Sequence, residues 1–152
     1  MNEIIATAAI SSLFTAFLGF VAFLLSQVYF KSIERYKDLK ARTVHALVFY
    51  ADTYLNPIDL ADIPDRKLPE RYEQASLELR KLAADWSAYI ELKARPGIFV
   101  AKNDVLETIS ANLIGLSNSM HVPFNSKDSK TSEYNELRAN KIKEFLKIYK
   151  QK

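Results

Sequence analysis

The residues of this chain that could do chemistry are few and scattered. Its 152 residues include two histidines, His45 and His121, and no cysteine, which excludes a multi-histidine metal site and thiolate ligands. The pairs Asp59/Asp62 and Asp62/Asp65 could bind a cation, but aspartates near prolines are more typical of turns. The sequence has no zinc-protease, serine-hydrolase, Gly-rich phosphate-loop or kinase motif. We therefore predict a non-enzymatic protein with no catalytic residue, no metal and no cofactor.

A polar cluster near the end of one predicted helix is the best candidate for a binding pocket. Asn112 is followed at helical spacing by Gly115 and Ser119, with Asn118 alongside. A glycine inside a helix costs about 1 kcal/mol, so Gly115 indicates the close approach of another backbone. Two interpretations stay open. Asn112, Gly115, Asn118 and Ser119 line a small pocket for a ligand or partner, or Gly115 and Ser119 mark a helix crossing, which we favour.

An apolar stretch at the N-terminus must position everything that follows. From Ile4 to Phe30 the sequence has no Lys, Arg, Asp, Glu, Pro or His. About 20 helical residues cross the ~30 Å hydrocarbon core of a bilayer, and this stretch is longer. Its start, Met1-Asn2-Glu3, is acidic, whereas a cleaved signal peptide begins with basic residues and has a shorter apolar region. We predict a transmembrane anchor over residues 1–30 and a cytoplasmic helical domain over residues 31–152.

Basic residues set the expected orientation. Lys31 and Arg35 follow the apolar stretch closely, and no Lys or Arg precedes it, so the N-terminus is expected outside and the C-terminal domain in the cytoplasm. Such basic residues suit the anionic inner leaflet of a membrane. Nucleic acid is the other partner of basic surfaces, but no recognition motif is present and we do not expect it. The last helix has a basic excess that includes Arg138, and the predicted basic surface consists of Lys31, Arg35, Lys141, Lys147 and Lys150.

A row of small residues runs along the apolar stretch at helical spacing. Small residues allow membrane helices to approach closely, and hydroxyl groups can hydrogen-bond across the contact. Serine and threonine can instead bond the backbone of their own helix, which is the competing interpretation. We favour self-association into a homo-oligomer, and whether the helices pack against each other or around a lumen stays open. The row consists of Thr7, Ser11, Thr15, Gly19, Ala22 and Ser26.

Hydrophobic periodicity predicts an all-α fold: one N-terminal transmembrane helix that continues into an up-and-down cytoplasmic four-helix bundle. The first helix is expected to run unbroken to Leu55, because Asn56-Pro57 forces an extended backbone. A second helix is expected from Glu70 to Lys93, a third capped by Asn103, and a last one capped by Thr131 or Ser132. The apolar face of the last helix is expected at Leu137, Ile142, Phe145, Leu146 and Tyr149.

Two segments carry a resemblance to known proteins. Leu79–Ala83 reads L-R-K-L-A and Ile114–Ser119 reads I-G-L-S-N-S. In these segments the chain resembles a group of small bacterial single-span membrane proteins with a C-terminal helical domain, which implies the bacterial inner membrane and no assigned activity. In architecture it also resembles the HEPN-like CRISPR-associated membrane accessory proteins of type VI-B systems, which implies antiviral defence. A HEPN nuclease needs R-x4-6-H on one helix, and no arginine has that spacing to His45 or His121.

These patterns predict a self-associating membrane protein whose cytoplasmic bundle senses a partner and acts at the bilayer, in a pore-like or membrane-perturbing way. The expected partners are the lipid bilayer, further copies of the chain and a soluble protein. One alternative is a membrane scaffold that tethers a soluble partner. The other is a degenerate HEPN-like domain that binds nucleotides or RNA.

Overall fold

The computed structural model describes residues 2–59, 63, 65, 67–92, 101–122 and 130–147. This part of the chain is mostly helical, which confirms the prediction of an all-α protein. A parallel pairing of two two-residue strands, with Ile58 opposite His121, is the exception among the described residues. The elements are α1 (Asn2–Leu25), the π-helix η1 (Ser26–Phe30), α2 (Lys31–Phe49), α3 (Ala51–Leu55), β1 (Ile58–Asp59), α4 (Glu70–Leu92), α5 (Asn103–Asn118), β2 (His121–Val122) and α6 (Lys130–Phe145).

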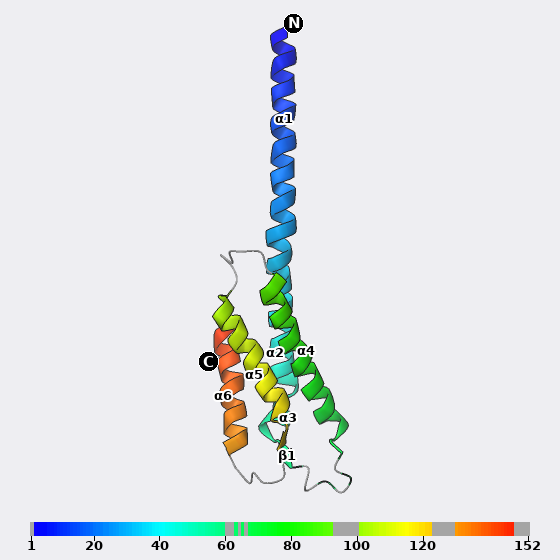
Figure 1. The fold of residues 1–152 in the computed structure, drawn as a ribbon, viewed down its shortest axis with the longest axis vertical. Coiled ribbons are helices and arrows are strands. Elements are labelled where there is room, and N and C mark those ends of the chain that lie inside the picture. Colours follow the sequence, from blue (N-terminus) through cyan, green and yellow to red (C-terminus); the bar gives the residue numbers. More distant parts are fainter. Residues whose placement is uncertain are drawn as a thin grey trace.

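Four of these helices pack side by side. The sequence of contacts is α2 with α4, α4 with α5, and α5 with α6, while the short α3 also touches α6. Successive long helices run in opposite directions, and α1 continues the line of α2 as a rod that projects from one end (Figure 1). The core between the packed helices includes Leu39, Leu47, Tyr54, Leu79, Leu82, Trp86, Leu106, Ile109, Leu113, Leu116 and Ile142.

The helix that joins the rod to the bundle is not uniform. It passes through the π-helix η1, whose hydrogen bonds reach one residue further than those of an α-helix. One inserted residue turns the following side chains by about 100° relative to an uninterrupted α-helix. The prediction of an unbroken helix to Leu55 is wrong at Tyr50, where φ is −103° and ψ is 19°. Helix α3 then ends before Pro57, as the sequence predicted.

Helices α2 and α4 are held together by a buried aromatic contact. The Trp86 side chain is fully buried, and its Nε1–H donates to Thr43 Oγ1 at 2.9 Å. Tyr36 packs edge-on against Trp86, with ring centroids 5.7 Å apart. Closer to α1, the Tyr89 and Ser32 hydroxyls lie 3.1 Å apart. Burial raises the pKa of Tyr89, so its hydroxyl stays protonated and available as a donor.

Pairs of serines join α4 to α5. Ser117 Oγ donates to the Ser76 carbonyl at 2.8 Å, and Ser76 Oγ donates in return to the Ser117 carbonyl at 3.1 Å. The Ser87 and Ser110 hydroxyls form a second pair at 2.9 Å. Side chains this small let the two helices approach closely while these hydroxyls keep their partners. These serine pairs were not predicted from the sequence.

The starts of the last two helices differ from the predictions. Asn103 is the first residue of α5 and does not cap it, since Lys102 holds the N-cap position without a side-chain hydrogen bond. Helix α6 begins at Lys130, so Thr131 and Ser132 lie in its first turn. Ser132 Oγ instead donates to the Leu55 carbonyl at 2.6 Å, which ties α6 to the end of α3.

The buried face of α6 contains the predicted Ile142 and continues to the predicted Leu146 just after the helix, and Phe145 is partly buried, but the face is rotated away from the predicted Leu137. Tyr149 lies outside the described residues. Leu137 is 64 % exposed, whereas Asn135 and Ala139 are buried. The amide of Asn135 explains the rotation: its Nδ2 donates to the Tyr54 carbonyl at 2.8 Å, and its Oδ1 accepts from Ser119 Oγ at 2.5 Å. A polar side chain thus takes a core position because it bonds α3 and α5 at once.

We predict that Asn135→Leu destabilises the fold by about 2–4 kcal/mol, because the Tyr54 carbonyl and the Ser119 hydroxyl lose their buried partner. Chemical denaturation followed by the fluorescence of the single tryptophan, Trp86, measures this. Asn140→Leu, at an exposed asparagine on the same helix, is the matched control and should change stability by less than about 0.5 kcal/mol. Equal effects of the two substitutions would contradict the role given to Asn135.

Candidate functional site

The large apolar side chains of α1 are exposed all around the helix. Exposure ranges from 43 % at Leu24 to 70 % at Leu13, and α1 projects away from the packed helices (Figure 1). Within the part of the chain that the structure describes, no helix combines the length and the hydropathy that a membrane crossing needs. The exposed side chains are Ile10, Leu13, Phe14, Phe17, Leu18, Phe20, Phe23, Leu24 and Leu25.

The row of small residues lies on this same exposed rod. Gly19 faces open space, since among the described residues no heavy atom lies within 4 Å of a Cβ built on it. Thr15 Oγ1 donates to the Ser11 carbonyl one turn earlier, at 2.9 Å. That bond is expected if serine and threonine bond the backbone of their own helix, which is the alternative to self-association. It gives the Thr15 hydroxyl an acceptor without a partner helix. Thr7, Ala22 and Ser26 are exposed as well.

Two residues of the predicted basic surface lie where the rod meets the bundle. Lys31 and Arg35 are exposed in the first turns of α2. Helix α6 runs back toward this end of the bundle, and Lys141 and Lys147 near its end are exposed (Figure 1). Lys150 lies outside the described residues. The described part of the predicted basic surface is therefore made of side chains that solvent or lipid headgroups can reach.

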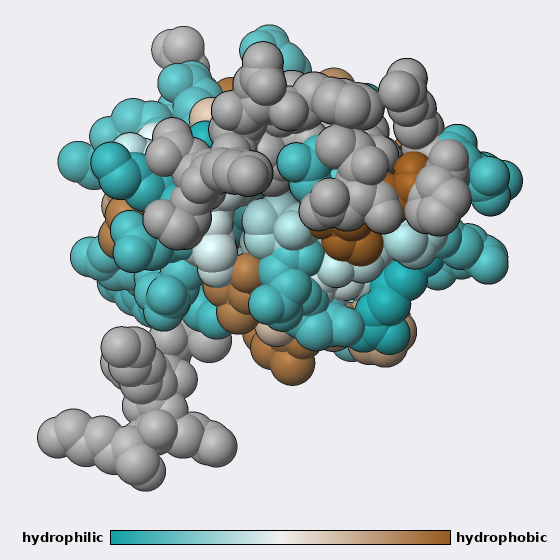
Figure 2. Space-filling view, turned by 90° about the horizontal axis from the view of Figure 1, so that it is seen from below, coloured by the Kyte–Doolittle hydropathy of each residue, from teal (hydrophilic) through white to brown (hydrophobic). Residues whose placement is uncertain are grey.

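The opposite end of the bundle is different in character. Figure 2 shows this end, where the described residues are mostly hydrophilic and the apolar ones form small separate spots. Scattered exposed apolar residues are normal on protein surfaces. A continuous exposed apolar surface is found on α1, at the other end of the molecule.

The four residues of the predicted polar pocket have different hydrogen-bond partners for the two asparagines and shared ones for Gly115 and Ser119. Asn112 Nδ2 donates to the Thr108 carbonyl of its own helix at 2.7 Å, whereas Asn118 Oδ1 accepts from Arg80 Nη2 at 2.8 Å. Ser119 bonds Asn135 across the contact with α6. Asn112 is thus bonded within α5 and Asn118 to α4, whereas Ser119 and Gly115 both reach the Asn135 and Arg138 side chains of α6.

Gly115 is a crossing point, as the favoured interpretation held, but the approaching group is a side chain. A Cβ at Gly115 would lie 2.7 Å from Arg138 Nε. The guanidinium donates from Nη1 to the Asn135 Oδ1 at 3.2 Å and to the Gly115 carbonyl at 3.4 Å. Arg138 is thus half-buried between α5 and α6. The sequence predicted it only as part of the basic excess of the last helix, whereas its guanidinium joins these two helices.

The two histidines that could do chemistry lie on separate elements, α2 and β2. His45 stacks on Phe49, with ring centroids 5.5 Å apart, and His121 lies in β2. Asp62 lies outside the described residues. Among the residues that are described, no group of three or more His, Cys, Asp or Glu side chains could hold a metal ion.

Comparisons with protein-family models, with curated proteins and with solved structures find no match to this chain. The resemblances drawn from the sequence therefore stay predictions.

Asn135 was not predicted from the sequence as a structural residue. Its signal was available, because Asn135, Ala139 and Ile142 recur at spacings of four and three along the last helix. Choosing Leu137 as the apolar position shifted the predicted face and left Asn135 outside it. Arg138 was missed for a related reason, since it was counted only by its charge.

We predict that the effect of Gly115→Ala depends on Arg138. In the native chain the new Cβ displaces the Arg138 guanidinium from its hydrogen bonds. This loss offsets the gain in helix propensity, so the free energy of unfolding does not rise. In an Arg138→Ala background the same substitution should stabilise the fold by about 1 kcal/mol. A double-mutant cycle by chemical denaturation measures the difference, and purely additive effects would contradict the contact.

Proposed function

We propose that this chain is a non-enzymatic membrane protein that self-associates through its N-terminal helix and presents its helical bundle on the cytoplasmic side. In this proposal residues 1–30 are the transmembrane anchor and residues 31–152 the cytoplasmic domain. The bundle senses a partner, and the assembly acts at the bilayer.

The observation that carries the proposal is the exposed apolar surface of α1. Burying a side chain of the size of leucine or phenylalanine stabilises by about 1.5–3 kcal/mol. Nine such described side chains on α1 are exposed in a single copy, so an apolar environment stabilises the rod by an amount on the order of 10 kcal/mol. The proposal rests on this exposure and on the uncharged sequence from Ile4 to Phe30, which is longer than a bilayer crossing requires.

Charge supports the orientation. Lys31 and Arg35 follow the rod directly, and α6 runs back toward this end of the bundle (Figure 1). Lys141 and Lys147, in and just after the last turns of α6, are exposed. Each basic residue near an anionic leaflet contributes about 1 kcal/mol of attraction. An inner leaflet at this end would therefore hold the bundle close to the membrane, while the hydrophilic opposite end faces the cytosol.

A membrane scaffold is the second candidate, and one observation favours it. Tyr134 and Leu137 lie one turn apart on α6 and are 56 % and 64 % exposed. Aromatic and aliphatic residues that protrude together are common anchors in protein interfaces. In this role α6 would hold a soluble partner and self-association would not be needed.

We predict that replacing Ser11, Thr15 and Gly19 together by leucine shifts the detergent-solubilised protein toward the monomer, because the bulky side chains keep two rods apart. Light scattering coupled to gel filtration measures the mass of the protein in the micelle. Phe17→Leu and Phe20→Leu, which lie on the face of α1 opposite this row at helical spacing, are the matched control and should leave the oligomer intact. An unchanged mass in the triple-leucine variant would contradict self-association through this row and favour the scaffold role.

A further inference from the structure

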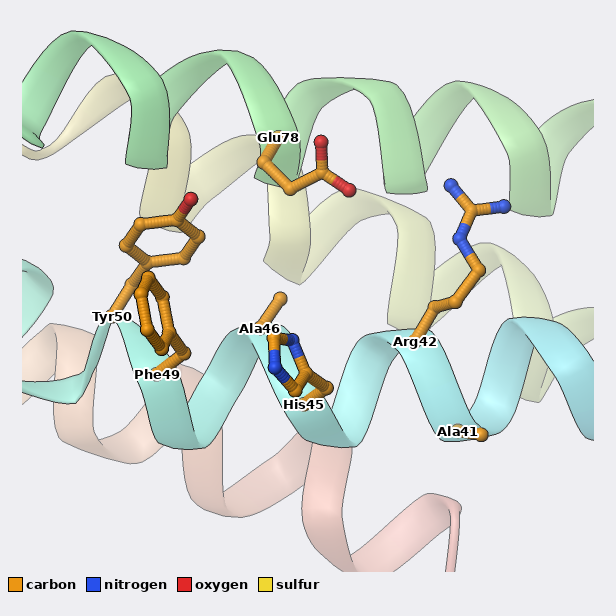
Figure 3. Close-up of a pocket in the computed structure, with 7 residues that line it drawn as sticks. All are labelled: Ala41, Arg42, His45, Ala46, Phe49, Tyr50 and Glu78. Atoms are coloured by element: carbon orange, nitrogen blue, oxygen red, sulfur yellow. The ribbon is translucent and has the colours of Figure 1, made fainter.

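A cavity of about 440 Å³ opens between α2 and α4. Its volume is within the range of small-molecule pockets, about 300–1,000 Å³. We call it the α2–α4 cavity. It is lined by Ala41, Arg42, His45, Ala46, Phe49, Tyr50 and Glu78 (Figure 3).

Arginine bridges close the groove on both sides of this cavity. Arg42 of α2 reaches Asp85 of α4, with 3.0 Å between Nη2 and Oδ2. At the other side, Arg71 of α4 reaches Asp52 of α3, with Nη2 and Oδ1 2.9 Å apart, and the hydrogen bond lowers the pKa of that carboxyl. Arg71 also donates to the Phe49 carbonyl at 3.3 Å. Between the two bridges the small side chains of the lining alanines leave the groove open.

Glu78 enters this opening without a basic partner. Its carboxylate extends from α4 into the space between Tyr50 and Arg42 (Figure 3). Within the described part of the chain, neither the Glu78 carboxylate nor the Tyr50 hydroxyl has a side-chain hydrogen bond or ion pair, although both residues are partly buried. Arg42 does not serve as the partner, because it is shared between Asp85 and, at 3.8 Å, Asp38. The cavity therefore contains a carboxylate that has no ion-pair partner, next to an arginine that is already paired with other carboxylates.

Aromatic rings form the wall of the cavity nearest to α3. Phe49 and Tyr50 pack edge to face, with centroids 4.9 Å apart, and His45 stacks on Phe49 at 5.5 Å. Ring faces attract cations and also accept the flat apolar part of a ligand. A carboxylate beside such a wall is suited to an ammonium group on an apolar or aromatic stem.

We propose that the α2–α4 cavity binds a small organic cation, an amine with an aromatic or apolar stem. The ammonium group pairs with the Glu78 carboxylate and donates to the Tyr50 hydroxyl, while the stem lies against the rings of Phe49 and Tyr50. Bound there, the ligand supplies the cation that bridges α2 and α4 at the gap between the Arg42 and Arg71 bridges. The proposal does not depend on self-association or on the membrane.

Tyramine is a suitable probe, and para-ethylphenol is its counterpart without the ammonium group. Calorimetric titration of the full-length protein in detergent should show binding of tyramine and about tenfold weaker binding, or none, of para-ethylphenol. Glu78→Gln should weaken tyramine binding by about tenfold or more, because it removes the charge and keeps the shape. Glu73→Gln makes the same change at an exposed position of α4 and should leave binding unchanged.

Ala41→Leu provides a test that alters no charge. Ala41 is exposed on α2, so the larger side chain narrows the cavity without disturbing the core, and tyramine binding should weaken. The proposal is overturned if tyramine does not bind, if para-ethylphenol binds as well as tyramine, or if Glu78→Gln or Ala41→Leu binds tyramine as the native chain does.

Discussion

The apolar surface of α1 is the physical constraint on which the other features of this molecule depend. The packed helices bury their own apolar faces, with Leu47, Trp86 and Leu113 fully enclosed, whereas α1 leaves its phenylalanines and leucines exposed. Soluble proteins rarely expose contiguous apolar patches larger than a few hundred Å². We have proposed a bilayer as the surrounding that removes this surface from water, and the basic residues at the start of α2 agree with that setting.

Helix α2 links α1 to the bundle, because it continues the line of α1 and also packs against α4 (Figure 1). Its first turn is held to the end of α4 by the Ser32–Tyr89 contact, and its middle by the hydrogen bond from Trp86 to Thr43. The π-helix η1 lies just before the first of these contacts. It thereby sets the rotation of the bundle relative to α1, so any surface shared by α1 and α2 depends on it.

The sequence predicted the helices well where periodicity and prolines act locally. The start of α4 at Glu70 and the end of α3 before Pro57 follow from such local rules. The details that depend on contacts between distant helices were missed. Asn135 enters the core through partners on α3 and α5, and Gly115 makes room for Arg138 from another helix. The α2–α4 cavity could not be predicted, because it needs side chains of two helices to meet across a groove.

The most direct test of the membrane anchor uses the absence of native cysteine. Single cysteines are placed at Phe17 in α1 and, as a reference, at the exposed Ala88 in α4, and each variant is treated with a membrane-impermeant maleimide. In a lipid-embedded rod, Phe17→Cys stays unmodified in intact and in broken cells until the protein is denatured, whereas Ala88→Cys is modified once the cells are broken. Modification of Phe17→Cys as fast as Ala88→Cys in broken cells would contradict the anchor.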